Sequence, residues 1–318
     1  MGYIPLELLH PQSCFQNDIL YPIHLAQHLA EAFHVSFGYL NANSDTMIVP
    51  LGPDNFIEPA QFDGLQPTVF VPGHQRGLFA VTLPADMEET DVWWTIRKPN
   101  GDVSRVPGRI GAVAYQLDWF ARPHGSMHPL VSFDGQNGDG RGPPGLMADR
   151  VETASVGSPV ALSVNARDPS ERDQDDFRFR NATPVNVTWS QLQGPGRVEF
   201  TRHESNPLPE PEPSAGRGGR GGGGGGGAAP DSAAIAAAIA AGGAGAAAAA
   251  RSGGRGRASP PQNIRLTEGY GTGSVYATFS APGEYLMRAR VDNFNSADSS
   301  GGDQCCWTNA FIRVTVTP

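Results

Sequence analysis

The chain has 318 residues, a formal net charge of −9 at pH 7, and 17% charged against 39% hydrophobic residues. This length suffices for two domains that each bury a core, and the 40 Gly and 28 Pro residues exclude a protein built mainly of long helices. Because the balance is acidic, a large nucleic-acid-binding surface is also disfavoured, and composition predicts an all-β protein.

The N-terminal third changes its pattern near residue 31. Residues 1–30 mix apolar residues, Pro and His without a sustained period, so we expect an irregular or partly helical segment that lacks the features of a secretory signal. From there the period becomes two, in short apolar runs separated by turns that contain Gly, Pro, Asn or Asp. These runs are 33–37, 46–49, 68–71, 78–83 and 92–96. They predict an antiparallel β-sandwich domain over 31–122.

Residues 123–150 are rich in Gly, Pro and Asp and predict a linker. A second β-sandwich is expected over 151–318, because apolar residues alternate with Ser, Asn, Thr and Arg along its predicted strands. The residues expected to point into its core are Val160, Leu162, Val164, Val185, Val187, Trp189, Val275, Ala277, Phe279, Tyr285, Met287, Ala289, Val291, Ile312, Val314 and Val316.

A low-complexity insertion interrupts this second domain at 205–262. It runs from Pro and Glu through a glycine tract into alanines, offers no buried face, and is expected to be disordered. Ala and Gly supply too little transfer free energy for a membrane span, and the Arg-Gly repeats lack the aromatic residues of an RNA-binding segment. We therefore expect a solvated loop whose deletion leaves the core intact.

The second domain resembles the immunoglobulin-like sandwich, and its PKD-type bacterial variant in particular. The resemblance rests on Trp189 in an early central strand and on Tyr285 three residues after Pro282, at a strand corner. The chain is also similar to a group of uncharacterised exported bacterial two-domain β proteins, through Phe37-Gly38-Tyr39-Leu40-Asn41 and Cys305-Cys306-Trp307-Thr308-Asn309. This resemblance implies a periplasmic or extracellular location, but no activity.

The order of strand directions places three long loops, at 166–183, 202–272 and 292–307, at one end of the second sandwich. Two of these loops are acidic, and hard carboxylate oxygens suit calcium. The candidate cation ligands are Asp168, Asp173, Asp175, Asp176, Asp292, Asp298 and Asp303. Their spacing is irregular and arginines lie among them, so a solvated acidic rim is the alternative.

Two further features could carry function. Trp93 is expected to point away from the core of the first domain, where it could stack on a sugar ring or pack under a loop. Adjacent Cys305 and Cys306 could form a vicinal disulfide; two free thiols, or one bond to Cys14, are the alternatives.

No catalytic motif is present. Together with the export that the resemblance implies, this leads us to expect a non-catalytic exported protein for recognition, adhesion or structure at the cell surface or in the periplasm. Its expected partner is a protein or polysaccharide of unknown identity, with no nucleic acid and no cofactor except calcium. The alternative is an accessory carbohydrate-binding part of an extracellular polysaccharide hydrolase. A third hypothesis is that the protein is a regulatory RNA binder that uses the Arg-Gly segment.

Overall fold

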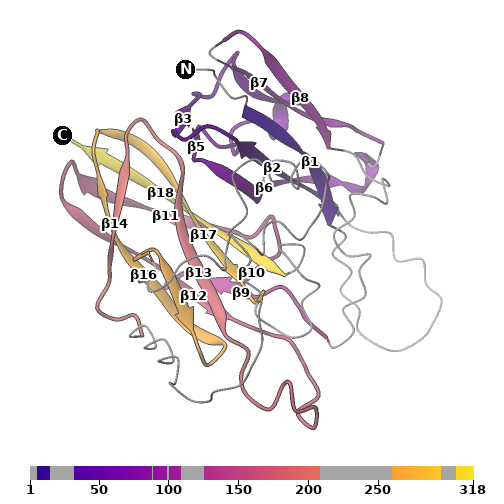
Figure 1. The fold of residues 1–318 in the computed structure, drawn as a ribbon, viewed down its shortest axis with the longest axis vertical. Helices are drawn as coiled ribbons and strands as arrows, with labels where there is room; N and C mark the ends of the chain where they lie inside the picture. Colours follow the sequence, from indigo (N-terminus) through magenta and orange to yellow (C-terminus); the bar gives the residue numbers. More distant parts are fainter. Residues whose placement is uncertain are drawn as a thin grey trace, which may run out of the picture. The chain divides into compact units, whose positions relative to one another are not determined.

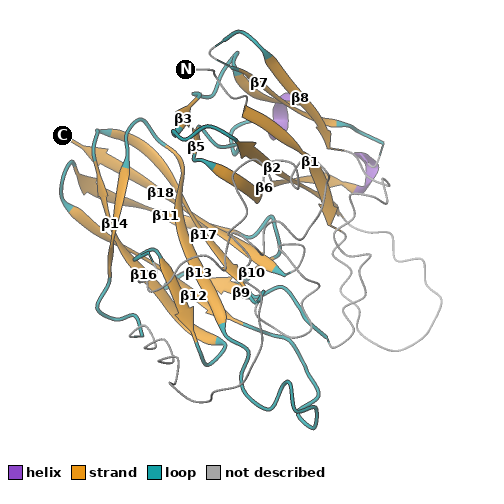
Figure 2. Ribbon diagram, viewed as in Figure 1, coloured by secondary structure: helices purple, strands orange, loops and turns teal. Residues whose placement is uncertain are grey.

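A computed structural model describes residues 6–14, 32–87, 89–98, 100–108, 125–207, 260–294 and 306–318, and nearly all of its regular structure is β-strand (Figures 1 and 2). The first module holds β1 (Leu6–Cys14), β2 (Ala32–Asn41), β3 (Met47–Ile48), β4 (Asn55–Glu58), β5 (Val69–Phe70), β6 (Gly73–Pro84), β7 (Val92–Arg97) and β8 (Val103–Gly108), with short 3-10 helices at Ala60–Phe62 and Ala85–Met87. The second holds β9 (Leu130–Ser132), β10 (Gly140–Arg141), β11 (Leu146–Ser155), β12 (Pro159–Arg167), β13 (Val185–Gln193), β14 (Val198–Arg202), β15 (Asn263–Leu266), β16 (Tyr270–Phe279), β17 (Gly283–Asp292) and β18 (Trp307–Thr317). No helix within these described ranges has the length and apolarity that crossing a bilayer requires.

The first module packs the sheet β1-β2-β6 against the sheet β4-β7-β8, and β3 and β5 form a small ribbon beside them. Aromatic rings fill the space between the sheets. Phe37 stacks on Phe79 with centroids 5.3 Å apart, and Trp94 meets both rings edge to face. All five apolar runs predicted as strands in this region form strands, because each buries one face against this core.

The second module is a sandwich of two five-stranded sheets, β10-β9-β12-β16-β14 and β11-β18-β17-β13-β15. The predicted all-β class and the two sandwiches are confirmed, and the strand pairs are antiparallel except for β11, which runs parallel to β18. Every residue predicted to point inward belongs to the core between these sheets or packs against it. The phenolic hydroxyl of Tyr285 donates to the carbonyl of Ala281, four residues upstream, at 2.8 Å. That bond is the tyrosine corner of immunoglobulin-like sandwiches.

Three segments differ from the sequence-based expectation. Residues 6–14, expected to be irregular, form β1, which pairs along β2 and is interrupted by a register shift between Leu9 and Gln12, around Pro11. The predicted linker at 123–150 contributes β9, β10 and the start of β11 to the second module. Residues 263–266, placed in the predicted loop 202–272, form β15. Backbone pairing with a neighbouring strand holds these segments, and short or edge strands carry little apolar periodicity.

An apolar interface joins the two modules. Leu192, Leu286 and Phe311 lie on the outer face of the second module's β11-β18-β17-β13-β15 sheet, yet all three are buried and belong to the core cluster of the first module. This sheet is therefore covered on both faces along β17 and β18. The two modules share one continuous apolar cluster rather than meeting through a wet surface.

A polar contact on one glycine completes this interface. The carbonyl of Gly77 in β6 accepts hydrogen bonds from Arg288 (3.0 Å), Trp307 (3.3 Å) and Asn309 (3.0 Å). Arg288 also donates to the Asn309 side chain at 2.9 Å. Burial of the Arg288 guanidinium is the main cause that lowers its pKa to about 9, and the positive charge of the neighbouring Arg290 is a smaller cause. The Trp-Thr-Asn motif of the sequence thus has a structural role between the modules.

The low-complexity insertion can be trimmed only between defined limits. Asn206 exchanges two hydrogen bonds with the backbone of Ser274 (2.6 and 3.0 Å), and the carbonyl of Gln262 accepts from Trp189 at 3.0 Å. Replacing residues 208–259 by a short Gly/Ser bridge should leave the melting temperature within a few degrees, since loop length enters stability only logarithmically. Deleting 205–262 instead removes these contacts and should lower it clearly. Calorimetry of both variants checks this, and equal melting temperatures would contradict it.

Candidate functional site

The loop that follows β12 and the segment that follows β17 meet at one end of the second module. The side-chain amide of Asn293 donates to the Asp168 carboxylate at 3.2 Å, and the amide of Asp168 donates to the carbonyl of Gly269 at 2.8 Å. The prediction that three long loops share one end is confirmed for their described parts. We call this the loop end; it is defined by residues 168–184, 267–270 and 293–294.

A buried ion pair fixes the loop end. Arg172 and Asp168 lie 2.7 Å apart with only 5% and 6% of their side chains exposed. Asp168 also accepts from the amide and the hydroxyl of Ser170, while Arg172 donates to Ser126 at 3.4 Å and lies over the ring of Phe179. Breaking such a pair leaves a charge in a poorly hydrated place, so the loop is held in one conformation.

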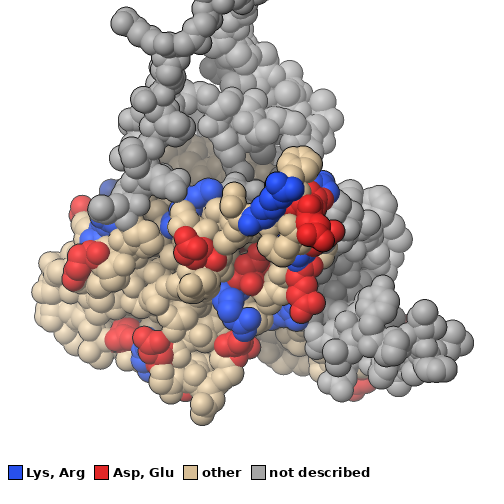
Figure 3. Space-filling model, turned by 90° about the horizontal axis from the view of Figure 1, so that it is seen from below, with Lys and Arg blue, Asp and Glu red and all other residues tan. Residues whose placement is uncertain are grey.

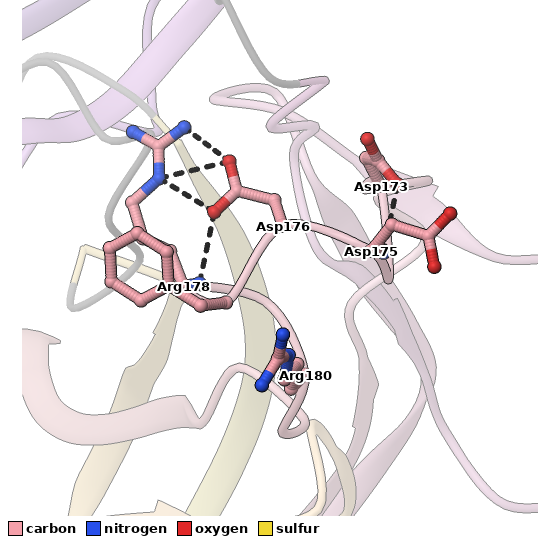
Figure 4. A pocket seen from close by; sticks show the side chains of 6 residues that line it. Asp173, Asp175, Asp176, Arg178 and Arg180 are labelled. Atoms are coloured by element: carbon pink, nitrogen blue, oxygen red, sulfur yellow. Dashed lines mark hydrogen bonds and ion pairs between the residues drawn. The ribbon is translucent and has the colours of Figure 1, made fainter.

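The predicted cation ligands do not converge among the described residues, where no group of three His, Cys, Asp or Glu side chains could hold a metal ion. Asp292 pairs with Arg290 at 3.1 Å and accepts from Asn186. In Figure 4 the carboxylate of Asp176 is turned to Arg178, while those of Asp173 and Asp175 point away from it. Asp298 and Asp303 lie outside the described residues, so the calcium site stays a prediction.

Two clefts lie at the loop end. The first is open, measures about 590 Å³, and is lined by Asp173, Asp175, Asp176, Phe177, Arg178 and Arg180. Phe177 stands beside it with 76% of its surface exposed. Figure 3 shows the molecule from the side where this loop projects in Figure 1, and acidic and basic side chains lie interleaved there. Because charges of both signs are interleaved, this face has no extended patch of one charge that would attract a strongly charged partner.

The second cleft is smaller, about 250 Å³, and lies between the 168–184 loop and the start of β16. Its floor includes Asp168, Arg172 and Phe179, and Tyr270 lies at its edge with 64% of its surface exposed. The sequence-based reading missed Tyr270, because it assigned residues 202–272 to a loop. The signal that could have found it is a large aromatic residue between two glycines.

Cys306 is disulfide-bonded and buried, and the Ser126 hydroxyl lies 3.9 Å from its sulfur. Its carbonyl accepts from the amide of Asn293 at 3.3 Å, so this disulfide adjoins the buried network. The bonded sulfur lies outside the described side chains, and the vicinal ring with Cys305 and the bond to Cys14 both stay open.

Trp93 lies far from the loop end in sequence and is already engaged. It is half-buried in β7, and the guanidinium of Arg105 lies 4.2 Å from the centroid of its ring. Arg105 in turn pairs with Glu58 at 2.9 Å. The guanidinium covers one face of the Trp93 ring, so a sugar could stack only on the other face. Stacking on Trp93 stays a prediction.

No family model matches the chain, and no curated protein matches it. Among solved structures, the chain is similar to the D00-D0 domain of intimin, with 11% identity over 99% of this chain and 100% of that chain and a TM-score of 0.23. The D0-D1 domain of intimin shows 10% identity over 90% of both chains and a TM-score of 0.22.

Proposed function

We propose that this chain is a non-catalytic recognition protein that binds its partner through the loop end of the second module, at the cell surface or in the periplasm. The observation that carries this proposal is that both clefts described above lie on loops fixed by a buried polar network. Binding surfaces on sandwich scaffolds are commonly built this way, from loops at one end of rigid sheets.

The chemistry of the second cleft supports binding rather than hydrolysis. A glycoside hydrolase needs two available carboxyl groups. Asp168 and Glu268 both line this cleft, but the oxygens of Asp168 are occupied by Arg172, Ser170 and Asn293. A carboxylate neutralised in this way is a poor general acid or nucleophile. The disulfide at Cys306 also supports export, because disulfides persist in oxidising compartments.

A loop-end variant tests the proposal. It carries serine at four exposed positions, Phe177, Arg180, Glu268 and Tyr270, and leaves the buried network intact. A matched control carries serine at Arg197 and Glu199, which are exposed near the opposite end of the sandwich. Labelled protein is applied to arrays of glycans and of purified surface proteins. We expect a ligand whose binding falls at least tenfold in the loop-end variant and is unchanged in the control.

The opposite pattern, in which binding survives the loop-end variant and is lost in the control, would contradict the proposal. Both variants should melt within a few degrees of the parent chain, because only exposed side chains change.

A further inference from the structure

The second cleft has a floor that is rigid and electrically balanced. The Asp168 and Arg172 side chains are more than nine-tenths buried, and their charges cancel. The Arg172 guanidinium lies 5.8 Å from the centroid of Phe179, which is itself buried. The exposed lining adds one further charge of each sign, from Arg167 and Glu268. The lining therefore sums to zero charge and selects neither an anion nor a cation.

An exposed aromatic residue, Tyr270, stands among the residues that line the cleft, in a turn of defined backbone conformation. Tyr270 lies between Gly269 and Gly271, whose φ angles of +78° and +140° suit glycine. A Cβ on Gly269 would lie 2.9 Å from the carbonyl oxygen of Thr183, so the turn is pressed against the 168–184 loop. Within the described residues, the hydroxyl of Tyr270 forms no hydrogen bond. The ring of Tyr270 is 64% exposed and is therefore accessible to a ligand in the described part of the chain.

We propose that this cleft binds one ring of a neutral saccharide, stacked on Tyr270. The assignment rests on the proposed function and names its ligand class. A sugar ring offers an apolar C–H face for the tyrosine and hydroxyl groups for polar partners. The side chains of Asn181 and Glu268 line the same cleft and supply these partners. At about 250 Å³, the cleft lies below the ~300–1,000 Å³ of a drug-sized site, which fits a single ring unit.

Titration calorimetry with neutral cello-, xylo-, manno- and galacto-oligosaccharides tests the assignment on the full chain. We expect at least one of them to bind. The Tyr270→Ala variant should weaken that binding by tenfold or more, whereas Tyr270→Phe, which keeps the ring, should stay within about threefold, as stacking does not use the hydroxyl. The matched control is Val151→Ala, which trims an apolar side chain of the second module that is 51% exposed and lies outside both clefts. It should leave binding unchanged.

A charge test separates a neutral ligand from a cationic one. Binding of a neutral saccharide should not depend on salt. Glu268→Gln removes the charge of a proposed hydrogen-bond partner but keeps an oxygen, so it should weaken this binding without making it salt-dependent. A steep fall of binding with salt would overturn the assignment. So would binding that persists in Tyr270→Ala, or no binding by any of the neutral oligosaccharides.

The two proposals fail differently. If neutral oligosaccharides do not bind but a protein or charged polymer binds and is lost in the loop-end variant, recognition at this end stands and the saccharide assignment falls. If a saccharide binds equally well to the loop-end variant, both fall.

Discussion

Replacing Gly77 with alanine is expected to lower the free energy of unfolding by about 3 kcal/mol. Gly77 has a φ of +56°, which costs an L-residue roughly 1–2 kcal/mol. A Cβ there would also overlap the indole of Trp307, whose Cε2 would lie 2.6 Å away and whose Nε1 would lie 2.9 Å away. Overpacking of this kind adds about 1–3 kcal/mol. The shift would also disturb the carbonyl that Arg288, Trp307 and Asn309 share.

Gly73 provides the matched control, because it lies in the same strand and also has a positive φ, of +94°. A Cβ at Gly73 would meet nothing within 4 Å. Gly73→Ala therefore carries the backbone cost alone, and we expect a loss of about 1 kcal/mol. Urea unfolding of the two variants measures the difference. Equal losses would show that the contact between Gly77 and Trp307 contributes little, and that the interface between the modules is softer than its packing indicates.

The cores of both modules could be predicted from the sequence, because a strand with one buried face repeats its apolar residues with a period of two. Along β13, for example, Val185, Val187 and Trp189 are buried and the residues between them are not. The same rule fails where a strand is buried on both faces. β18 is buried without alternation from Trp307 to Ile312, and the outward Phe311 supports the first module. Continuous burial of this kind indicates that both faces of the strand are covered. The sequence analysis predicted burial on one face of this strand only.

The loop end was predictable in position but not in chemistry. Strand directions alone place the loops together, whereas the partners of each side chain depend on local geometry. Asp168 shows the difference, since the sequence pattern made it a cation ligand and the structure pairs it with Arg172, four residues later. Tyr270 shows it again, because strand β16 begins at that residue and turns it to the edge of a cleft.

Asp168→Asn should destabilise the second module by about 3 kcal/mol, because it leaves the charge of Arg172 buried without its counter-ion. The substitution keeps the shape of the side chain, so packing changes little. The control is Asp139→Asn, in a pair whose atoms lie 3.8 Å apart and whose side chains are 48% and 60% exposed. Exposed pairs contribute about 0–1 kcal/mol, so we expect no clear change. Thermal and urea unfolding measure both variants.

A double variant decides whether an orphaned charge is the cause. Combining Asp168→Asn with Arg172→Met removes the orphaned charge of Arg172 and places an apolar side chain over Phe179. Because buried ion pairs can often be replaced by apolar residues, the double variant should recover part of the lost stability. A double variant no more stable than Asp168→Asn alone would locate the loss in the hydrogen bonds from Ser170 and Asn293 instead. Recovery would mean that the ion pair serves the shape of the loop end rather than the stability of the sandwich.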